Sequence, residues 1–245
     1  MPSWRAGLTV YMPIYADVEL LKYSLRNFNR FPRDTQFIFV LDRVNGYTQW
    51  VIRRYVKTGV IRIFHTVYES WRYGWRNHLN FLIRNVDYYF RYSDYILFTQ
   101  ADVILDIDTI LNNYRRNQVV CYSQRLGLRW DLPRAIHRLF RGKMFSGIYT
   151  IDSDLYYRIR PEANDPMSFE NKVSRYTDWI EVKSKTVNLR PYTRHSLYRM
   201  GRLRRRLGTP FYKQLLWSLL YLDFNSLRGY LDEAGEVDTE EMVRV

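Results

Sequence analysis

The sequence predicts an α/β fold with a mostly parallel central sheet flanked by helices. Short, continuously apolar segments alternate with segments of helical periodicity through about the first 105 of its 245 residues. Continuously apolar strands are typical of parallel sheets, because helices cover both faces of such sheets. The chain is long enough to form one large domain with a full hydrophobic core.

The expected elements follow one another in a regular order. Strands are predicted from apolar and β-branched runs at 8–14, 37–41, 60–64, 95–99, 119–122, 145–151, 186–189 and 192–195. Helices are predicted from apolar residues at helical spacing at 17–28, 48–57, 74–89, 108–116, 152–159 and 211–224. Asp108 is expected to cap its helix, and a helix or turn is expected around Asp178. The basic segment 129–143 is expected to be a loop.

The charge of the chain is strongly basic. The 38 Lys and Arg residues against 25 Asp and Glu residues give a net charge of +13, which leaves nucleic acid, anionic lipid and phosphorylated substrates open as partners. The single cysteine, Cys121, excludes an intrachain disulfide and a cysteine-based zinc site.

Two patterns bear on location. The first residues carry no signal-peptide pattern, and no apolar run reaches the roughly 18 residues that span a bilayer, so we expect a cytoplasmic protein. An arginine-rich segment followed by an apolar helix, 199–224, predicts peripheral membrane contact, and with it a lipid-linked acceptor. The helix at 211–224 is equally compatible with a core element or a homodimer contact.

The strand at 95–99 ends in the polar sequence Gln100-Ala101-Asp102. Open α/β sheets bind ligands outside the carboxyl ends of their strands, and Asp102 is predicted to lie there. A carboxylate suits Mg²⁺ or Mn²⁺ and, through the ion, a phosphate. The alternative is that Asp102 only ends the strand or caps a helix.

Seven blocks of sequence between Leu8 and His195 occur in an order shared with a known family. They are LTVYMPIYADVELLKYSLRNF, FIFVLDRVNG, YGWRNHLNFLI, YILFTQADVIL, FSGIYTIDSDLYYRI, RYTDWIEV and TRHSLY. In these blocks the chain resembles the glycosyltransferases of the GT-A fold, most closely family 2, the inverting enzymes that use nucleotide-sugar donors.

The blocks depart from the family pattern at four places. Asp42 alone remains of the Asp-Asp-Gly-Ser sequence that ends the second strand, and only Trp75 separates Gly74 from Arg76. Gln100 stands at the first acidic position of the Asp-x-Asp motif, and Thr177 replaces the Glu of the Glu-Asp motif.

The resemblance implies a GT-A domain at 1–198, with a nucleotide-binding half at about 1–105 and an acceptor half at about 106–198. A basic and apolar helical extension follows at 199–231, and an acidic tail at 232–245. It implies transfer of a sugar, with inversion, from a nucleotide-diphosphate donor to a glycan, lipid-linked or protein acceptor.

The resemblance also implies roles for individual residues. The donor and its cofactor are expected to bind at Asp42, Arg76, Asn77, Gln100, Ala101 and Asp102. Asp102 and His195 are the expected ligands of Mn²⁺ or Mg²⁺, although the neutral Gln100 weakens such a site and puts metal dependence in doubt. Asp178 is the expected general base.

Each of these roles has an alternative. Asp42 could be a turn residue and Arg76 part of a solvated helix face, while Asp178 could be a helix cap. Asp152 and Asp154 are rival acids. The arginines Arg202 and Arg204 could share the neutralisation of phosphate charge.

Three other functions compete with sugar transfer. A nucleotidyltransferase should carry a Gly-rich basic loop after its first strand, where this chain has IYADVE. A nucleic-acid-binding protein would explain the charge, but no recognised binding motif occurs. A GT-A protein that has lost catalysis would explain Gln100 and Thr177.

Overall fold

The computed structural model describes residues 5–15, 18–42, 46–66, 81–125, 145–160, 169–189, 197–198, 201–202, 204–205 and 208–232. Internal contacts divide the chain into two units. Unit 1 comprises Met1–Arg125 and Lys143–Leu189, and unit 2 comprises Leu126–Gly142 and Arg190–Val245. The predicted division at 198 and 231 stays a prediction.

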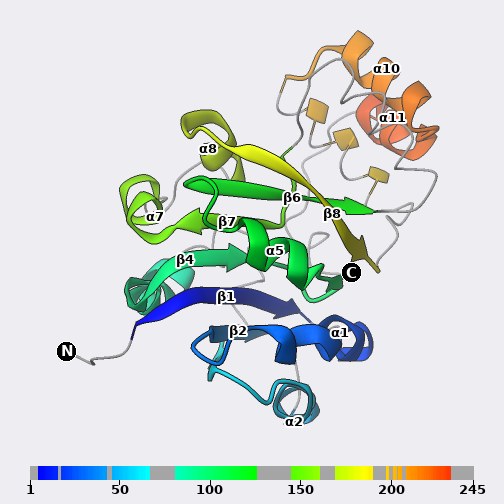
Figure 1. Cartoon of the computed structure of the whole chain (residues 1–245). Coiled ribbons are helices and arrows are strands. Elements are labelled where there is room, and N and C mark those ends of the chain that lie inside the picture. The colour runs from blue at the N-terminus through cyan, green and yellow to red at the C-terminus, as the bar shows by residue number, and fades with distance from the viewer. Residues whose placement is uncertain are drawn as a thin grey trace. The chain divides into compact units, whose positions relative to one another are not determined.

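One sheet organises unit 1 (Figure 1). Its strands in the described residues are β1 (Ala6–Tyr15), β2 (Gln36–Asp42), β3 (Val60–His65), β4 (Ser93–Phe98), β5 (Val103–Ile104), β6 (Val119–Arg125), β7 (Tyr149–Asp152) and β8 (Ile180–Asn188), in the order β3-β2-β1-β4-β7-β6-β8-β5. The pairs β1–β2, β1–β4, β2–β3 and β6–β8 are parallel. β7 runs antiparallel to β4 and β6, and β5 runs antiparallel to β8. The predicted mostly parallel α/β fold is confirmed.

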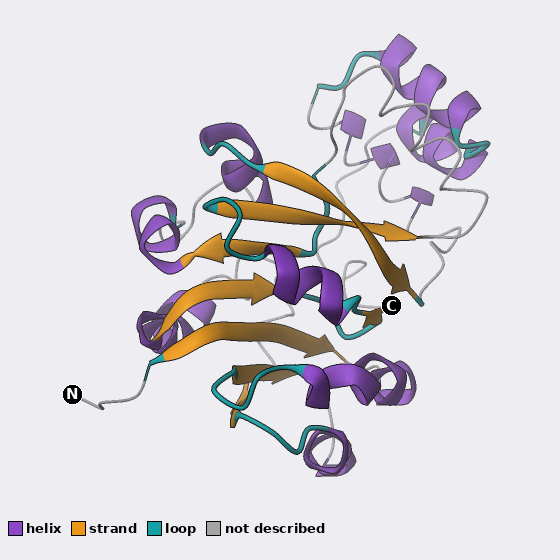
Figure 2. Ribbon diagram, in the orientation of Figure 1, coloured by secondary structure: helices purple, strands orange, loops and turns teal. Residues whose placement is uncertain are grey.

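Helices cover both faces of this sheet, as Figure 2 shows by colour. One face packs against α1 (Val18–Ser24), the 3₁₀ helix η1 (Leu25–Arg30), α2 (Gly46–Tyr55) and α5 (Ile107–Asn113). The other packs against the π-helix η2 (Leu82–Val86), the 3₁₀ helix η3 (Asp87–Tyr92), α7 (Ser153–Ile159) and α8 (Phe169–Tyr176). Successive strand residues point to opposite faces, so Val10 and Met12 join one core while Tyr11 joins the other.

Unit 2 contains a pair of helices where the sequence predicted one. α10 (Phe211–Leu220) and α11 (Phe224–Leu231) are separated at Leu222, whose φ is 49°, and the Asp223 side chain then caps α11 by accepting from the Ser226 N–H. No helix among the described residues is long and apolar enough to cross a membrane.

Five other predicted features need correction or stay open, and one helix was not predicted. The cap of α5 is Asp106, whose side chain accepts from the Thr109 N–H, and not Asp108. The predicted strand at 186–189 is only the last part of β8, and α8 was not predicted at all. The predicted elements at 74–80, 129–143 and 192–195 lie outside the described residues, apart from the continuation of the first as η2 and η3.

Candidate functional site

The carboxyl ends of β1, β2 and β4 lie at one edge of the sheet. Tyr15, the last residue of β1, pairs with Asp42, the last residue of β2. Phe98, at the end of β4, pairs with Tyr11, and the Thr99 N–H donates to the Tyr11 carbonyl oxygen at 3.1 Å. The chain after β4 therefore emerges at the edge that carries Asp42, which is where such sheets bind ligands.

Asp42 is buried at this edge, with 1% of its surface exposed. The strand end is held by Thr66, whose N–H and hydroxyl both donate to the Leu41 carbonyl oxygen, at 2.9 and 3.3 Å. Asp42 is therefore not a solvated turn residue, and its role in donor binding stays a prediction.

The turn after β4 is fixed from two sides. The Ser24 hydroxyl of α1 donates to the Ala101 carbonyl oxygen at 2.6 Å, and the Leu189 N–H donates to the Asp102 carbonyl oxygen at 2.7 Å. The Asp102 side chain is half-buried, and this burial raises the pKa of its carboxyl above the ordinary value. The ionised form is therefore under-solvated and gains from a nearby cation.

Gly147 lies next to the predicted site residue Gln100, a proximity that the sequence alone did not indicate. A Cβ atom on Gly147 would lie 3.1 Å from Nε2 of Gln100, so the missing side chain leaves room for the Gln100 amide. The neighbouring Ser146 is buried, and its hydroxyl donates to the Tyr122 carbonyl oxygen at 2.5 Å. The Ser146-Gly147 pair, one residue before β7, is the sequence signal that would have identified this position.

The donor atoms at this edge fit a magnesium or manganese ion. Asp102 offers a carboxylate and Gln100 an amide oxygen, and such hard oxygen ligands with substrate phosphates and water are the usual set for Mg²⁺. The residues that the structure describes contain no group of three or more His, Cys, Asp or Glu side chains that could hold a metal by themselves. A metal held here by the described residues would therefore need further ligands, such as oxygen atoms of a bound substrate.

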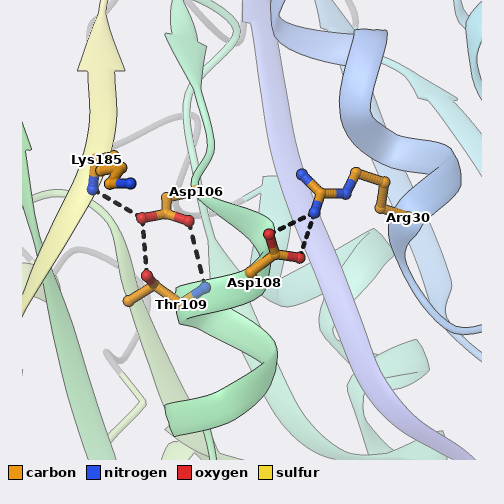
Figure 3. A network of polar contacts seen from close by, with 5 residues as sticks. All are labelled: Arg30, Asp106, Asp108, Thr109 and Lys185. Carbon is orange, nitrogen blue, oxygen red and sulfur yellow. Dashed lines mark hydrogen bonds and ion pairs between the residues drawn. The ribbon is translucent and has the colours of Figure 1, made fainter.

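A polar network beyond the turn holds α5 in place (Figure 3). The Asp106 carboxylate accepts from the Lys185 N–H of β8 at 2.8 Å and from the Thr109 hydroxyl at 2.8 Å. Burial alone would raise the pKa of Asp106, but these hydrogen bonds outweigh it and lower the pKa. Arg30 of η1 pairs with Asp108 on the other side. The segment from Gln100 to α5 is thus attached to three elements of the sheet and its helices.

The structure does not bring Asp178 to this edge. β8 ends at Asn188, which pairs with Val103 beside the Asp102 turn, whereas Asp178 precedes the first residue of β8, Ile180. A nine-residue strand at about 3.3 Å per residue spans at most roughly 25 Å, and β8 lies between the Asp102 turn and Asp178. The strand pairing therefore does not bring Asp178 next to the Asp102 turn, and its role as a base stays a prediction.

Three further predicted residues, Arg76, Asn77 and His195, lie outside the described residues, and their roles stay predictions. Asp152 caps α7 by accepting from the Leu155 N–H, which accounts for it structurally.

Comparison with known proteins supports the fold. No model of a protein family matches the sequence, and no curated protein matches it. Among solved structures, the chain is similar to the mannosyltransferase PcManGT from Pyrobaculum calidifontis, solved with GDP-Man and Mn²⁺. The TM-score is 0.59 and the identity 17%, over 99% of this chain and 79% of that one.

A second similar structure is TarS of S. aureus, residues 1–349. The TM-score is 0.53 and the identity 13%, and the match covers 81% of this chain and 64% of that one. TarS has also been solved with UDP-GlcNAc, in a structure that matches with the same TM-score. The sheet order, the flanking helices and these similarities together show that the chain has the GT-A fold of glycosyltransferases.

Proposed function

We propose that the chain is a glycosyltransferase that moves a sugar from a nucleotide-diphosphate donor to a hydroxyl acceptor. The observation that carries this is that Asp42, at the end of β2, and the Gln100–Asp102 turn, after β4, follow strands whose carboxyl ends lie at one edge of a GT-A sheet. Support comes from PcManGT, solved with GDP-Man and Mn²⁺, and from TarS, solved with UDP-GlcNAc.

In this function the two carboxylates have different tasks. Asp42, buried at the end of β2, accepts a hydrogen bond from the nucleoside of the donor. Asp102 and Gln100 hold Mn²⁺ or Mg²⁺ against the donor diphosphate, with Arg76 and His195 as further candidates. The ion, when bound, neutralises the charge that grows on the departing nucleoside diphosphate.

The acceptor oxygen attacks the anomeric carbon, the bond from that carbon to the diphosphate breaks, and the acceptor proton passes to a base. The configuration at the anomeric carbon inverts. Asp178 precedes β8, whose other end meets the Asp102 turn, so we propose a base at another position.

The amino end of α8 is the better place to search. The Phe169 ring, at the first position of α8, lies 5.5 Å from the ring of Phe98 at the end of β4. By sequence, the next residue is Glu170. We therefore expect Glu170→Gln to lower turnover by about 10² to 10⁴, the usual contribution of a general base, while nucleotide binding is retained.

The test is a transfer screen over a panel of nucleotide sugars with mass-spectrometric detection, joined to thermal shift with GDP and UDP, with and without Mn²⁺. A nucleotide-dependent stabilisation together with a glycosylated product supports the function. NMR of the product reports inversion or retention. Stabilisation by DNA with steep salt dependence, and none by nucleotides, would replace sugar transfer with nucleic-acid binding.

A further inference from the structure

Helix α10 of unit 2 has its polar and apolar faces reversed. The buried positions on α10 are Gln214 and Ser218, each no more than 1% exposed. Leu216 and Leu219 lie on the outside, with 63% and 53% of their surfaces exposed. A helix that packs in a water-soluble domain normally buries its apolar stripe, so this helix faces an apolar or interfacial surrounding.

The buried polar side chains between α10 and α11 form a hydrogen-bond network. Nε2 of Gln214 donates to the hydroxyl oxygens of Ser218 and Ser226, at 3.0 and 2.9 Å. Nη1 of Arg204 donates to Oε1 of the same glutamine at 3.2 Å. Gly229 of α11 packs so tightly that a Cβ atom would lie 1.9 Å from the Tyr198 carbonyl oxygen. These buried polar groups satisfy one another's hydrogen bonds, so they fix how the two helices pack. The same packing keeps the apolar side chains of α10 on the outside.

The outer surface of the pair concentrates the exposed apolar residues of the molecule. Of the twelve large hydrophobic residues exposed in the described part of the chain, seven lie between Phe211 and Leu231, and the exposed leucines lie only there. The main members are Tyr212, Leu216, Leu219, Leu222 and Phe224. We call these five residues the apolar face. A concentration of exposed apolar side chains of this kind is typical of an interaction surface.

Charge decides between the candidate occupants of the apolar face. Unit 2 has 14 basic and eight acidic residues, a net charge of +6, with six of the acids in 232–245. The acid on the helix pair itself, Asp223, is buried as the cap of α11. Lys213 and Arg228, on the two helices, are exposed. A second copy of the chain would bring two basic surfaces together, whereas anionic lipid headgroups would complement them.

We propose that the apolar face docks unit 2 on an anionic membrane surface. α10 has ten residues and is about 15 Å long, half the thickness of a bilayer core, so the helix lies in the interface and does not span it. The apolar face enters the headgroup boundary, and Lys213 and Arg228 pair with lipid phosphates. This docking is independent of the reaction assigned to unit 1.

The experiment is flotation of the full chain with extruded vesicles of phosphatidylcholine alone, or with 30% phosphatidylserine, at low and high salt. We expect binding to the anionic vesicles that high salt weakens. The double variant Leu216→Glu/Leu219→Glu should lose at least about tenfold in partitioning, since two charged groups then enter the interface. Lys213→Ala should lose about fivefold, the effect of one basic residue near an anionic surface.

The matched control is Tyr176→Glu, which places the same charge at an exposed aromatic residue of unit 1 and should bind like the wild type. Circular dichroism checks that all variants fold, as expected for exposed positions. Absence of wild-type binding to anionic vesicles, or equal binding by the double variant, would overturn the docking. So would a wild-type dimer in light scattering that the double variant dissociates, because the apolar face would then be covered by a second copy.

Discussion

Two carboxylates lie near the two ends of strand β8, and they differ in their exposure to solvent. At its last residues, β8 meets the Asp102 turn, where burial raises the pKa of the carboxyl. Before its first residue stands Asp178, whose side chain is exposed to solvent. A desolvated carboxylate gains more from binding a cation than an exposed one, because water already stabilises the exposed charge. The position of an acid along a strand therefore decides its chemistry as much as its residue type does.

The largest expected difference between the two ends is in turnover. Asp102→Asn removes the charged ligand of the donor site and should lower transfer by about 10²-fold or more. Asp178→Asn should leave transfer within about twofold of the wild type. Initial rates with a nucleotide sugar that the wild type uses measure both, and a reversed ranking of the two variants would contradict the placement of the site.

The pH dependence of cation binding should differ between the two ends as well. The raised pKa of Asp102 means that its proton competes with Mn²⁺ at a higher pH than at an ordinary carboxyl, whose pKa is about 3.9. Stabilisation of the chain by Mn²⁺ with GDP or UDP should therefore weaken as the pH falls toward that raised value, and Asp178→Asn should show the same profile. Thermal shift across a pH series, with Asp102→Asn lacking this profile, is the measurement.

Without a bound cation, the ionised Asp102 side chain is expected to lower the free energy of unfolding instead of raising it. A folded-state pKa above the unfolded value means that ionised Asp102 destabilises the fold as the pH rises through that value. We expect apo Asp102→Asn to be at least as stable as the wild type at pH 7, as measured by urea unfolding. A clear loss of stability would show that the carboxylate is compensated by the protein itself.

A smaller effect is expected from the network that attaches α5 to β8. Asp106→Ala removes the helix cap and the acceptor for the Lys185 N–H, at a cost of about 1 to 2 kcal/mol in the free energy of unfolding. The lowered pKa of Asp106 means that its contribution is present above the ordinary carboxyl pKa and is lost as the pH falls through the lowered value. Urea unfolding at pH 7 and pH 3 should show a larger gap between wild type and variant at pH 7.

The smallest expected effect is at Gly147. A Cβ atom there would lie 3.1 Å from the end of the Gln100 side chain, which can rotate away. Gly147→Ala should therefore leave stability nearly unchanged and raise the KM for the donor by only a few fold, since Gln100 leaves its position. Steady-state kinetics check this, with Gly46→Ala as a control, because no atom lies within 4 Å of the Cβ position there. An unchanged KM for the donor would show that Gln100 does not contribute to donor binding.

The sequence predicted the half of the fold whose strands are buried on both faces. β2 is buried at every position, so its residues form a continuous apolar run that ends visibly at Asp42. Most residues of β8 are half-exposed, and the charged Lys183 and Lys185 interrupt its apolar residues. Its sequence pattern therefore resembles that of a loop or turn. α8 buries only Phe169 and Val173 among the side chains described, too few for a clear helical period.

The differences around the site have the same physical origin. The sequence predicts Asp178 beside Asp102 because it does not reveal the direction or the register of β8. Asp106 and Asp108 are two residues apart, and only the non-helical backbone of Asp106, with φ −85° and ψ 83°, selects it as the cap. The break between α10 and α11 depends on one left-handed residue, Leu222, that no residue preference predicts.

The most direct measurement of the donor site is anomalous diffraction from a crystal soaked with Mn²⁺ and GDP or UDP. We expect an anomalous peak within about 2.3 Å of an Asp102 carboxylate oxygen, with the nucleoside beside Asp42. A nucleotide bound beside Asp178 at the start of β8, with no manganese near Asp102, would contradict the account.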